Sequence, residues 1–348
     1  MLEELFDSVQ LGKLRLKNRL VRAATWEGVA DPDGSPGAKI EKMYTAMAAG
    51  GIGMIIGSYT RVAEFDQPTP GMMGLFADGQ LAGWQALATA VHRYDTPLCA
   101  QLVLGGAWQR PDGSSPGDNL SDAFTEADMA GICALFGQAA LRAKAAGVDA
   151  VQIHAAHGYF LSRSLSPKYN THTGEWGGSP ARRSRLLVAV YQLLRQQLGS
   201  DYPILIKINC EDFEEGGATL DDSLSACVQL ARLGLDGIEV SGGGRIWRTG
   251  VKTPSVFAEQ AAVIAHHSGV PVMLTGNNRD PRQLTKLLQE TEIGLFGLAR
   301  PLLAEPDLAS RWQRELVPAF CNSCGGCYLP EGTGCGRKKA LAEQGKTS

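Results

Sequence analysis

The segment VQIHAAHGYFLSRSLSPKYN, residues 151–170, begins as a short apolar run and ends as a group of polar side chains. The run is too short for a helix and has the composition of a strand buried on both faces. His154 and His157 lie three residues apart, and Gly158 and Tyr159 follow at once. In α/β barrels the carboxyl ends of the strands form the reaction site. The segment therefore predicts a barrel strand that delivers His154, His157 and Tyr159 to such a site.

Seven more apolar runs of similar length are spaced along the chain, with helix-like segments between them. The eight runs are residues 19–25, 53–58, 97–103, 149–154, 203–209, 236–242, 270–276 and 293–299. Thr125 with Asp128 predicts a capping box, and Ser179 and Asp280 precede prolines as N-caps do. Left-handed C-terminal positions are predicted at Gly147, Gly199, Gly234 and Gly269. Eight strand–helix units predict a (β/α)8 TIM barrel of the α/β class, with a doubly wound sheet as the alternative.

Composition narrows the classes of function. The chain has 348 residues, 44% of them hydrophobic, and a net charge of -3, which gives no basic patch for nucleic acid or for a membrane surface. No apolar run approaches the roughly 20 residues of a membrane span. The first residues lack the apolar core of a signal peptide, so we expect a cytoplasmic protein. We expect one barrel domain over residues 1–316 and a short cysteine-rich tail over residues 317–348.

Polar residues follow the predicted strands at several other places, notably Thr25, Gln101, Lys207 and Asn209. Barrel geometry would bring them to the same mouth as the two histidines. The alternative is that such residues only face water. The pair His-x-x-His also allows a zinc site, although no third ligand follows at an obvious spacing and a tyrosine does.

The eight cysteines fall into two groups. Cys99, Cys133, Cys210 and Cys227 are scattered and are expected to be small buried hydrophobic residues. The other four form the pattern Cys-x2-Cys-x2-Cys-x7-Cys, at Cys321, Cys324, Cys327 and Cys335. Four thiolates in one short loop repel one another without a cation, so this tail predicts a bound metal or cluster.

Three motifs together resemble the Old Yellow Enzyme family of flavin-dependent ene-reductases. They are LGKLRLKNRLVRAAT (residues 11–25), the opening segment followed by EWGGSPARRSR (residues 175–185), and FGLARPLLAEPDL (residues 296–308). The resemblance implies a (β/α)8 barrel that binds flavin mononucleotide (FMN) non-covalently and is reduced by NAD(P)H in the same pocket. No Gly-x-Gly-x-x-Gly opens a helix after a strand, which agrees with a shared pocket.

The resemblance also assigns residues to the cofactor. Ala23, Ala24 and Thr25 would lie along the flavin edge, Gly57 would allow close backbone approach, and Gln101 would bond the pyrimidine edge. Lys207 would stabilise the negative charge near N1 and O2 of the reduced ring. The phosphate would meet residues of the late loops, namely Gly243, Gly276, Asn277, Ala299 and Arg300. Asn277 stands where the family commonly has glycine.

The same resemblance assigns chemical roles to the polar residues of the opening segment. His154 and His157 would donate hydrogen bonds to a substrate carbonyl, hydride would reach the β-carbon, and Tyr159 would protonate the α-carbon as general acid. The substrate would be an enone, an enoate or an enoyl-CoA. Its identity, the choice of NADH or NADPH, and association into a homo-oligomer stay open. Trp26, Tyr59, Trp247 and Arg248 are candidate pocket residues, although a lone aromatic residue more often serves packing than recognition. Arg245 and Arg248 are candidates to receive a substrate carboxylate or a CoA phosphate, or equally solvated loop charges.

The tail resembles the [4Fe-4S] motif of the 2,4-dienoyl-CoA reductase and trimethylamine dehydrogenase branch, where the spacings are wider. Structural zinc and an unmetallated remnant are the alternatives. Two other functions stay open beside the ene-reductase. One is a trimethylamine-dehydrogenase-like amine oxidation, and the other is a non-enzymatic metal- or redox-sensing barrel.

Overall fold

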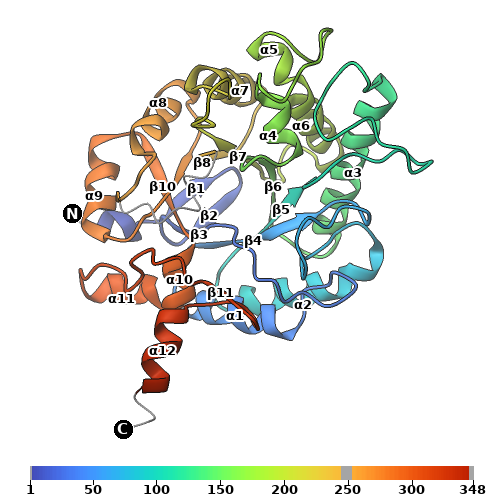
Figure 1. The fold of residues 1–348 in the computed structure, drawn as a ribbon. Helices are drawn as coiled ribbons and strands as arrows, with labels where there is room; N and C mark the ends of the chain where they lie inside the picture. The colour runs from blue at the N-terminus through green and yellow to red at the C-terminus, as the bar shows by residue number, and fades with distance from the viewer. Residues whose placement is uncertain (1, 244–252, 345–348) are drawn as a thin grey trace.

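A closed barrel of eight parallel strands forms the body of the protein in a computed structural model that describes residues 2–243 and 253–344 (Figure 1). Neighbouring strands follow the order β10-β3-β4-β5-β6-β7-β8-β9. The strands are β3 (Leu20–Arg22), β4 (Met54–Arg61), β5 (Leu98–Val103), β6 (Ala150–Ala155), β7 (Ile204–Asn209), β8 (Gly237–Ser241), β9 (Val272–Thr275) and β10 (Ile293–Leu298). Each lies within or beside one of the eight apolar runs, so the (β/α)8 prediction is confirmed and the doubly wound sheet was wrong.

Helices form a ring around the strands in Figure 1, as the connections of a parallel sheet require. The outer helices are α1 (Ala38–Ala49), α2 (Leu81–His92), α3 (Glu126–Ala145), α6 (Arg185–Leu198), α7 (Leu220–Arg232), α8 (Ala258–Ser268), α9 (Pro281–Glu290) and α11 (Leu308–Arg314). Shorter elements are η1 (Leu2–Phe6), η2 (Asp78–Gln80), α4 (Phe160–Leu165), α5 (Pro180–Arg183) and α10 (Arg300–Ala304). Because helices cover the strands from outside and side chains fill the barrel inside, every residue of β5, β6, β7 and β8 is buried.

The predicted helix ends are largely confirmed. At the start of α3 the Thr125 hydroxyl accepts from the Asp128 amide at 3.3 Å, and the Asp128 carboxylate accepts from the Thr125 amide at 2.8 Å. Asp280 caps α9 by accepting from the Arg282 amide at 3.0 Å. Ser179 holds the N-cap position of α5 but makes no side-chain capping bond. The four predicted glycines adopt positive φ, at Gly147, Gly199, Gly234 and Gly269.

A small hairpin closes the end of the barrel opposite the strand carboxyl ends. Strands β1 (Val9–Leu11) and β2 (Leu14–Leu16) pair antiparallel in a separate two-stranded sheet. Leu11 and Leu16 are buried in a cluster with residues from the first half of the strands, such as Met54 and Ala150. Apolar side chains therefore seal this end, and access to the interior is from the other.

The cysteine-rich segment folds back onto the open end of the barrel. Its elements are the hairpin β11 (Tyr328–Leu329) and β12 (Gly332–Thr333) and the helix α12 (Gly336–Gln344). The Ser323 hydroxyl donates to Asn277 Oδ1 at 2.7 Å in the loop after β9. The Thr333 amide donates to the Glu27 carbonyl at 2.8 Å in the loop after β3. The segment is thus joined to two loops of the mouth.

A membrane span is not found in the described part of the chain, because its helices are too short or too polar to cross a bilayer.

Candidate active site

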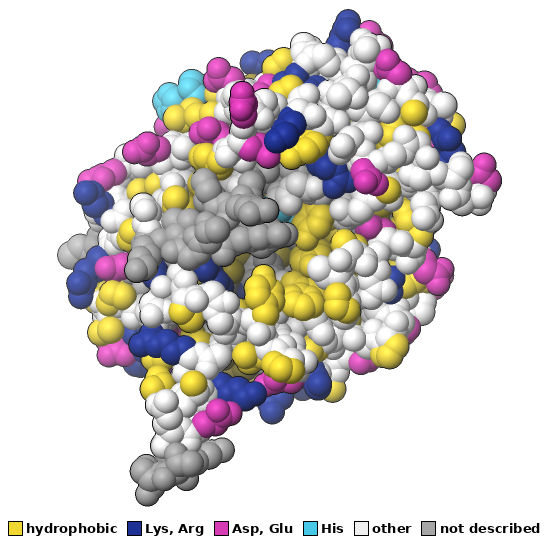
Figure 2. Space-filling view, viewed as in Figure 1, with side chains coloured by type: hydrophobic (Ala, Val, Ile, Leu, Met, Phe, Trp, Pro, Cys, Tyr) yellow, Lys and Arg dark blue, Asp and Glu magenta, His cyan; other side chains and the backbone are white. Residues whose placement is uncertain are grey.

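A cavity of about 560 Å³ lies at the carboxyl ends of the barrel strands, within the usual range for small-molecule sites. Residues after β3, β9 and β10 line it together with residues of β4, β5, β6, β7 and the cysteine-rich segment. Hydrophobic side chains gather near the middle of the molecular face in Figure 2. The cavity therefore lies where the predicted barrel would have its reaction site.

Most of the residues predicted for the site share this cavity. Its lining includes Ala24, Thr25, Gln101, His154, His157, Tyr159, Lys207, Gly276, Asn277, Ala299, Arg300, Cys321 and Cys327. The residues predicted for the site that do not line it are Ala23, Gly57, Gly243, Cys324 and Cys335.

Gly57 and Gly243, which were predicted to approach the cofactor, have surroundings that differ from those expected. A Cβ on Gly57 would point to Trp84, 3.4 Å away, on the helix side of β4. A Cβ on Gly243 would lie 2.7 Å from Asn209 Nδ2, so close packing against the end of β7 explains this glycine. The structure gives neither residue a place in the cavity wall.

The two histidines meet edge to face at the end of β6. Their ring centroids are 5.1 Å apart. His157 is in the left-handed region with φ of 62°, which turns the chain sharply after the strand. The Asn209 side chain holds this turn by accepting from the His157 amide at 2.9 Å. The strand end and a side chain of β7 thus fix both rings at the cavity wall.

Hydrogen bonds set the tautomer of His154. The Ala156 amide donates to His154 Nδ1 at 3.3 Å, so Nδ1 is an acceptor and Nε2 bears the proton. Burial lowers the pKa of His154 well below its usual value, and the nearby His157 and Lys207 add to the effect. At neutral pH the ring is uncharged and has an N–H to donate.

His157 is neutral for similar reasons and has a partner that sequence reasoning missed. Burial, followed by the charge of Lys207, lowers the pKa of His157 well below its usual value. Its Nε2 lies 2.9 Å from the hydroxyl oxygen of Ser241, at the end of β8. If the Ser241 hydroxyl donates in this contact, the proton of His157 is on Nδ1.

Tyr159 stands at the start of α4, next to the histidines and to a second tyrosine. Its ring centroid is 5.0 Å from that of His154 and 5.4 Å from that of Tyr59 on β4. Tyr59 in turn bonds Thr69, with the two hydroxyl oxygens 2.6 Å apart. The cavity therefore has a phenol beside a pair of neutral imidazoles.

Lys207 provides a buried positive charge in the same cavity. Its ammonium lies 2.7 Å from Glu239 Oε1, and the two side chains are 3% and 0% exposed. The contact is a buried ion pair between an ammonium and a carboxylate. An ammonium has three N–H donors, so the pair with Glu239 leaves others for a ligand in the cavity.

A row of amide side chains connects Glu239 with Gln101. Gln152 Nε2 donates to Glu239 Oε2 at 2.9 Å, and Gln101 Nε2 donates to Gln152 Oε1 at 2.6 Å. Gln152 and Glu239 were missed as site residues. The signal was present, since each is a lone polar residue inside a short apolar strand, in VQIH and GIEV.

The far end of the cavity is basic. Arg300 and Arg279 both line it, close to Gly276 and Asn277. A Cβ on Gly276 would lie 2.6 Å from the ring of Phe257, so only glycine fits between the cavity and that ring. Two guanidinium groups beside a glycine, which has no side chain, can bind an anion such as phosphate. Arg279 was not predicted.

The four tail cysteines lie near one another. Burial raises the pKa of Cys327 to about 11, and the thiols of Cys321, Cys324 and Cys335 act in the same direction, while Arg300 opposes them. Among the described residues no three His, Cys, Asp or Glu side chains are gathered closely enough to hold a metal ion.

Tyr328 is a further residue of the site that sequence reasoning missed. It follows Cys327 directly, lines the cavity, and its ring centroid lies 5.8 Å from the centroid of Trp26. No pattern in the sequence marks it. Of the other pocket candidates, Trp26 and Tyr59 line the cavity, and Arg245, Trp247 and Arg248 lie outside the described residues.

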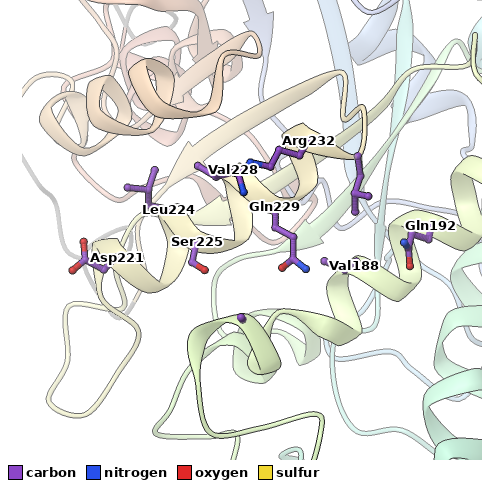
Figure 3. A pocket seen from close by; sticks show the side chains of 10 residues that line it. Val188, Gln192, Asp221, Leu224, Ser225, Val228, Gln229 and Arg232 are labelled. Carbon is purple, nitrogen blue, oxygen red and sulfur yellow. The ribbon is translucent and has the colours of Figure 1, made fainter.

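A second and larger hollow, of about 740 Å³, lies on the outer layer between α6 and α7. Figure 3 shows Leu224 and Val228 of α7 and Val188 of α6 along it. Its lining contains no histidine, tyrosine or cysteine. The barrel mouth is therefore the candidate active site.

Comparison with known proteins identifies the family. The family described as NADH:flavin oxidoreductase / NADH oxidase matches residues 4–318. An NADH oxidase from Thermoanaerobacter brockii is 29% identical, over 93% of this chain and 53% of that protein. An NADPH dehydrogenase from Halalkalibacterium halodurans is 29% identical, over 90% of this chain and 94% of that protein.

Solved structures agree on the fold. A 2-naphthoyl-CoA reductase in complex with 2-naphthoyl-CoA superposes with a TM-score of 0.84 at 22% identity, over 92% of this chain and 54% of that chain. The present chain thus spans about half the length of the NADH oxidase and of this reductase. The family match extends over nearly the whole chain and confirms the resemblance that its motifs show. The chain therefore belongs to the NADH:flavin oxidoreductase / NADH oxidase family.

Proposed function

We propose that this chain is an FMN-dependent NAD(P)H reductase of C=C bonds conjugated to a carbonyl group. The observation that supports it most directly is the cluster of His154, His157 and Tyr159 in one cavity with the buried ammonium of Lys207. Neutral imidazoles, a phenol and a fixed cation suit a reaction that develops charge on a carbonyl oxygen and ends with a proton transfer.

The residues of the cavity fit FMN. Lys207 is buried with N–H groups to donate, and the buried hydroxyl of Thr275 has no hydrogen-bond partner among the described residues. Both line the cavity, and buried polar groups of this kind normally have a partner. Lys207 and Gln101 would hold the ring, while Arg279, Arg300 and the backbone near Gly276 would hold the phosphate. Bound FMN would supply hydride, taken from NAD(P)H, to the substrate's β-carbon.

The side chains around the ring perform the remaining steps. His154 donates its Nε2 proton in a hydrogen bond to the carbonyl oxygen of an enone, enoate or enoyl-CoA. His157 does the same from Nδ1 when Ser241 donates to its Nε2. The two bonds draw electrons from the C=C bond and stabilise the enolate oxygen. Tyr159 then gives a proton to the α-carbon and regains one from water.

The tail is proposed to hold a metal centre with Cys321, Cys324, Cys327 and Cys335 as ligands. A [4Fe-4S] cluster is favoured over zinc because the cysteine pattern resembles the [4Fe-4S] motif of the 2,4-dienoyl-CoA reductase and trimethylamine dehydrogenase branch. It would also stand next to the cavity, since Cys321 and Cys327 line it. Its role would be to pass electrons to or from the flavin.

The first experiment is an absorption spectrum of anaerobically purified protein, with iron and zinc measured in the same sample. We expect flavin bands over a broad iron–sulfur shoulder, and bleaching of the flavin by NADH or NADPH. The bleached protein should recover its colour when 2-cyclohexenone is added. A colourless protein that does not take up FMN would overturn the proposal. If the reduced flavin is reoxidised by dioxygen but by no enone, and if a tertiary amine bleaches the oxidised flavin, the site would instead catalyse amine oxidation.

A further inference from the structure

We propose that Glu239 sets the reduction potential of the bound flavin, through its ion pair with Lys207 and through the orientation that it imposes on Gln101. The inference rests on the proposed function, because it concerns FMN held at the barrel mouth. It assigns a tuning role to a residue that would not touch the cofactor itself.

The strand register brings the four residues of this row together. Lys207 and Glu239 are direct partners on β7 and β8, and Gln101 and Gln152 are direct partners on β5 and β6. Glu239 is fully buried, as is Gln152. A buried carboxylate facing a buried ammonium at 2.7 Å interacts much more strongly than the same pair would in water.

The charge of Glu239 opposes the effect expected of Lys207. Reduction adds negative charge to the flavin, and a lone ammonium nearby would favour the reduced form. A carboxylate 2.7 Å from that ammonium offsets much of its field. Glu239 therefore keeps the flavin a stronger reductant than a lysine alone would make it.

Glu239 also decides which group Gln101 presents to the cavity. An ionised carboxylate only accepts hydrogen bonds, so Gln152 turns its NH2 group toward Glu239. The carbonyl of Gln152 is then the acceptor for the NH2 group of Gln101. The carbonyl oxygen of Gln101 is left for the ligand, and it matches the N–H of the flavin pyrimidine ring.

The test is the midpoint potential of bound FMN in Glu239→Gln, measured by anaerobic titration against a reference dye. We expect a shift to more positive potential relative to wild type. Asp128→Asn is the matched control, because Asp128 is also a buried carboxylate in an ion pair, but its partner Arg110 does not line the cavity, whereas Lys207 does. Its potential should equal that of wild type. An unchanged or more negative potential in FMN-replete Glu239→Gln would overturn the proposal.

A double variant keeps the proposal testable if Glu239→Gln does not fold. Lys207→Gln should lower the potential, and Lys207→Gln with Glu239→Gln, which removes both charges, should recover part of that loss. Equal potentials in the single and double variants would contradict a role for Glu239. A wild-type protein without FMN refutes the proposed function, whereas bound FMN with an unmoved potential refutes this inference alone. A purely structural role would lower the melting temperature and leave the potential unchanged.

Discussion

Among single side chains, the proposed reaction depends most on the phenol of Tyr159. In Tyr159→Phe we expect intact FMN and normal reduction by NAD(P)H. Turnover of a weakly activated enone should fall by about 10² or more, the usual contribution of a general acid. Stopped-flow measurement of the two half-reactions separates these effects. Tyr202→Phe is a matched control, since its buried hydroxyl bonds Val148 away from the cavity. Unchanged enone turnover in Tyr159→Phe would remove this residue from proton donation.

The two histidines at the end of β6 give the protein a specific dependence of stability on pH. Their pKa values are lowered well below 6.5, so the folded chain takes up fewer protons than the unfolded chain as pH falls below that value. The free energy of unfolding should therefore be constant above pH 6.5. Below it, the loss approaches about 1.4 kcal/mol per pH unit for each histidine.

Urea unfolding at pH 7.5, 6.5 and 5.5 measures this dependence. His154→Asn should reduce the loss between pH 6.5 and 5.5 by about half, because one of the two histidines is gone. His266→Asn is the control, since His266 is exposed beside Glu292. A wild-type protein equally stable at pH 5.5 and 7.5 would show that these rings are protonated in the folded state.

At the scale of elements, the loop after β9 holds the cysteine-rich segment in place. Asn277 has φ of 61°, accepts from Ser323 through Oδ1, and donates from Nδ2 to the Thr253 carbonyl at 2.7 Å. In Asn277→Gly the backbone strain is relieved, by roughly 1 kcal/mol, while both side-chain bonds are lost. We expect little change in overall stability but faster amide exchange at Cys327 and Thr333.

Hydrogen–deuterium exchange followed by mass spectrometry checks this expectation. Ser323→Ala removes the same contact from the other side and should give a similar increase. Ser310→Ala, which loses a bond to the Gly50 carbonyl elsewhere, should leave these amides unchanged. Equal exchange in all three variants would mean that other contacts hold the segment.

Strands and helix caps could be predicted from local sequence patterns, whereas contacts between strands could not. Strand positions were predictable because each buried run is apolar, short and flanked by turn residues, as in residues 203–209. The capping box at Thr125 was predictable, and Thr219 with Asp222 forms a similar box that was not predicted. The β1–β2 hairpin was not predicted because its strands are only three residues each, too short for an alternating pattern to show. Partners across strands, such as Ser241 for His157, depend on register and could not be obtained from local pattern.

At the scale of the whole molecule, the hairpin β1–β2 should contribute stability without affecting the mouth. Leu16→Ala removes a fully buried side chain from the sealed end, and we expect a loss of about 2–5 kcal/mol in the free energy of unfolding. Flavin absorption and enone turnover should stay as in wild type. Leu233→Ala, at a position 42% exposed, is the matched control with little expected effect. A Leu16→Ala protein that loses its flavin while still folded would show that the two ends are coupled.

The hairpin between Cys327 and Cys335 has a consequence for measurements on this protein. Tyr328 is 68% exposed at the cavity rim, in tilted contact with the ring of Trp26, and its hairpin is flanked by two of the proposed ligands. If the tail holds the proposed cluster, its loss in air would free this wall while leaving the histidines and Tyr159 in place. An aerobic preparation would then contain two populations with similar maximal rates and different Michaelis constants for bulky substrates. Progress curves from such a mixture would resemble negative cooperativity in a protein with one site.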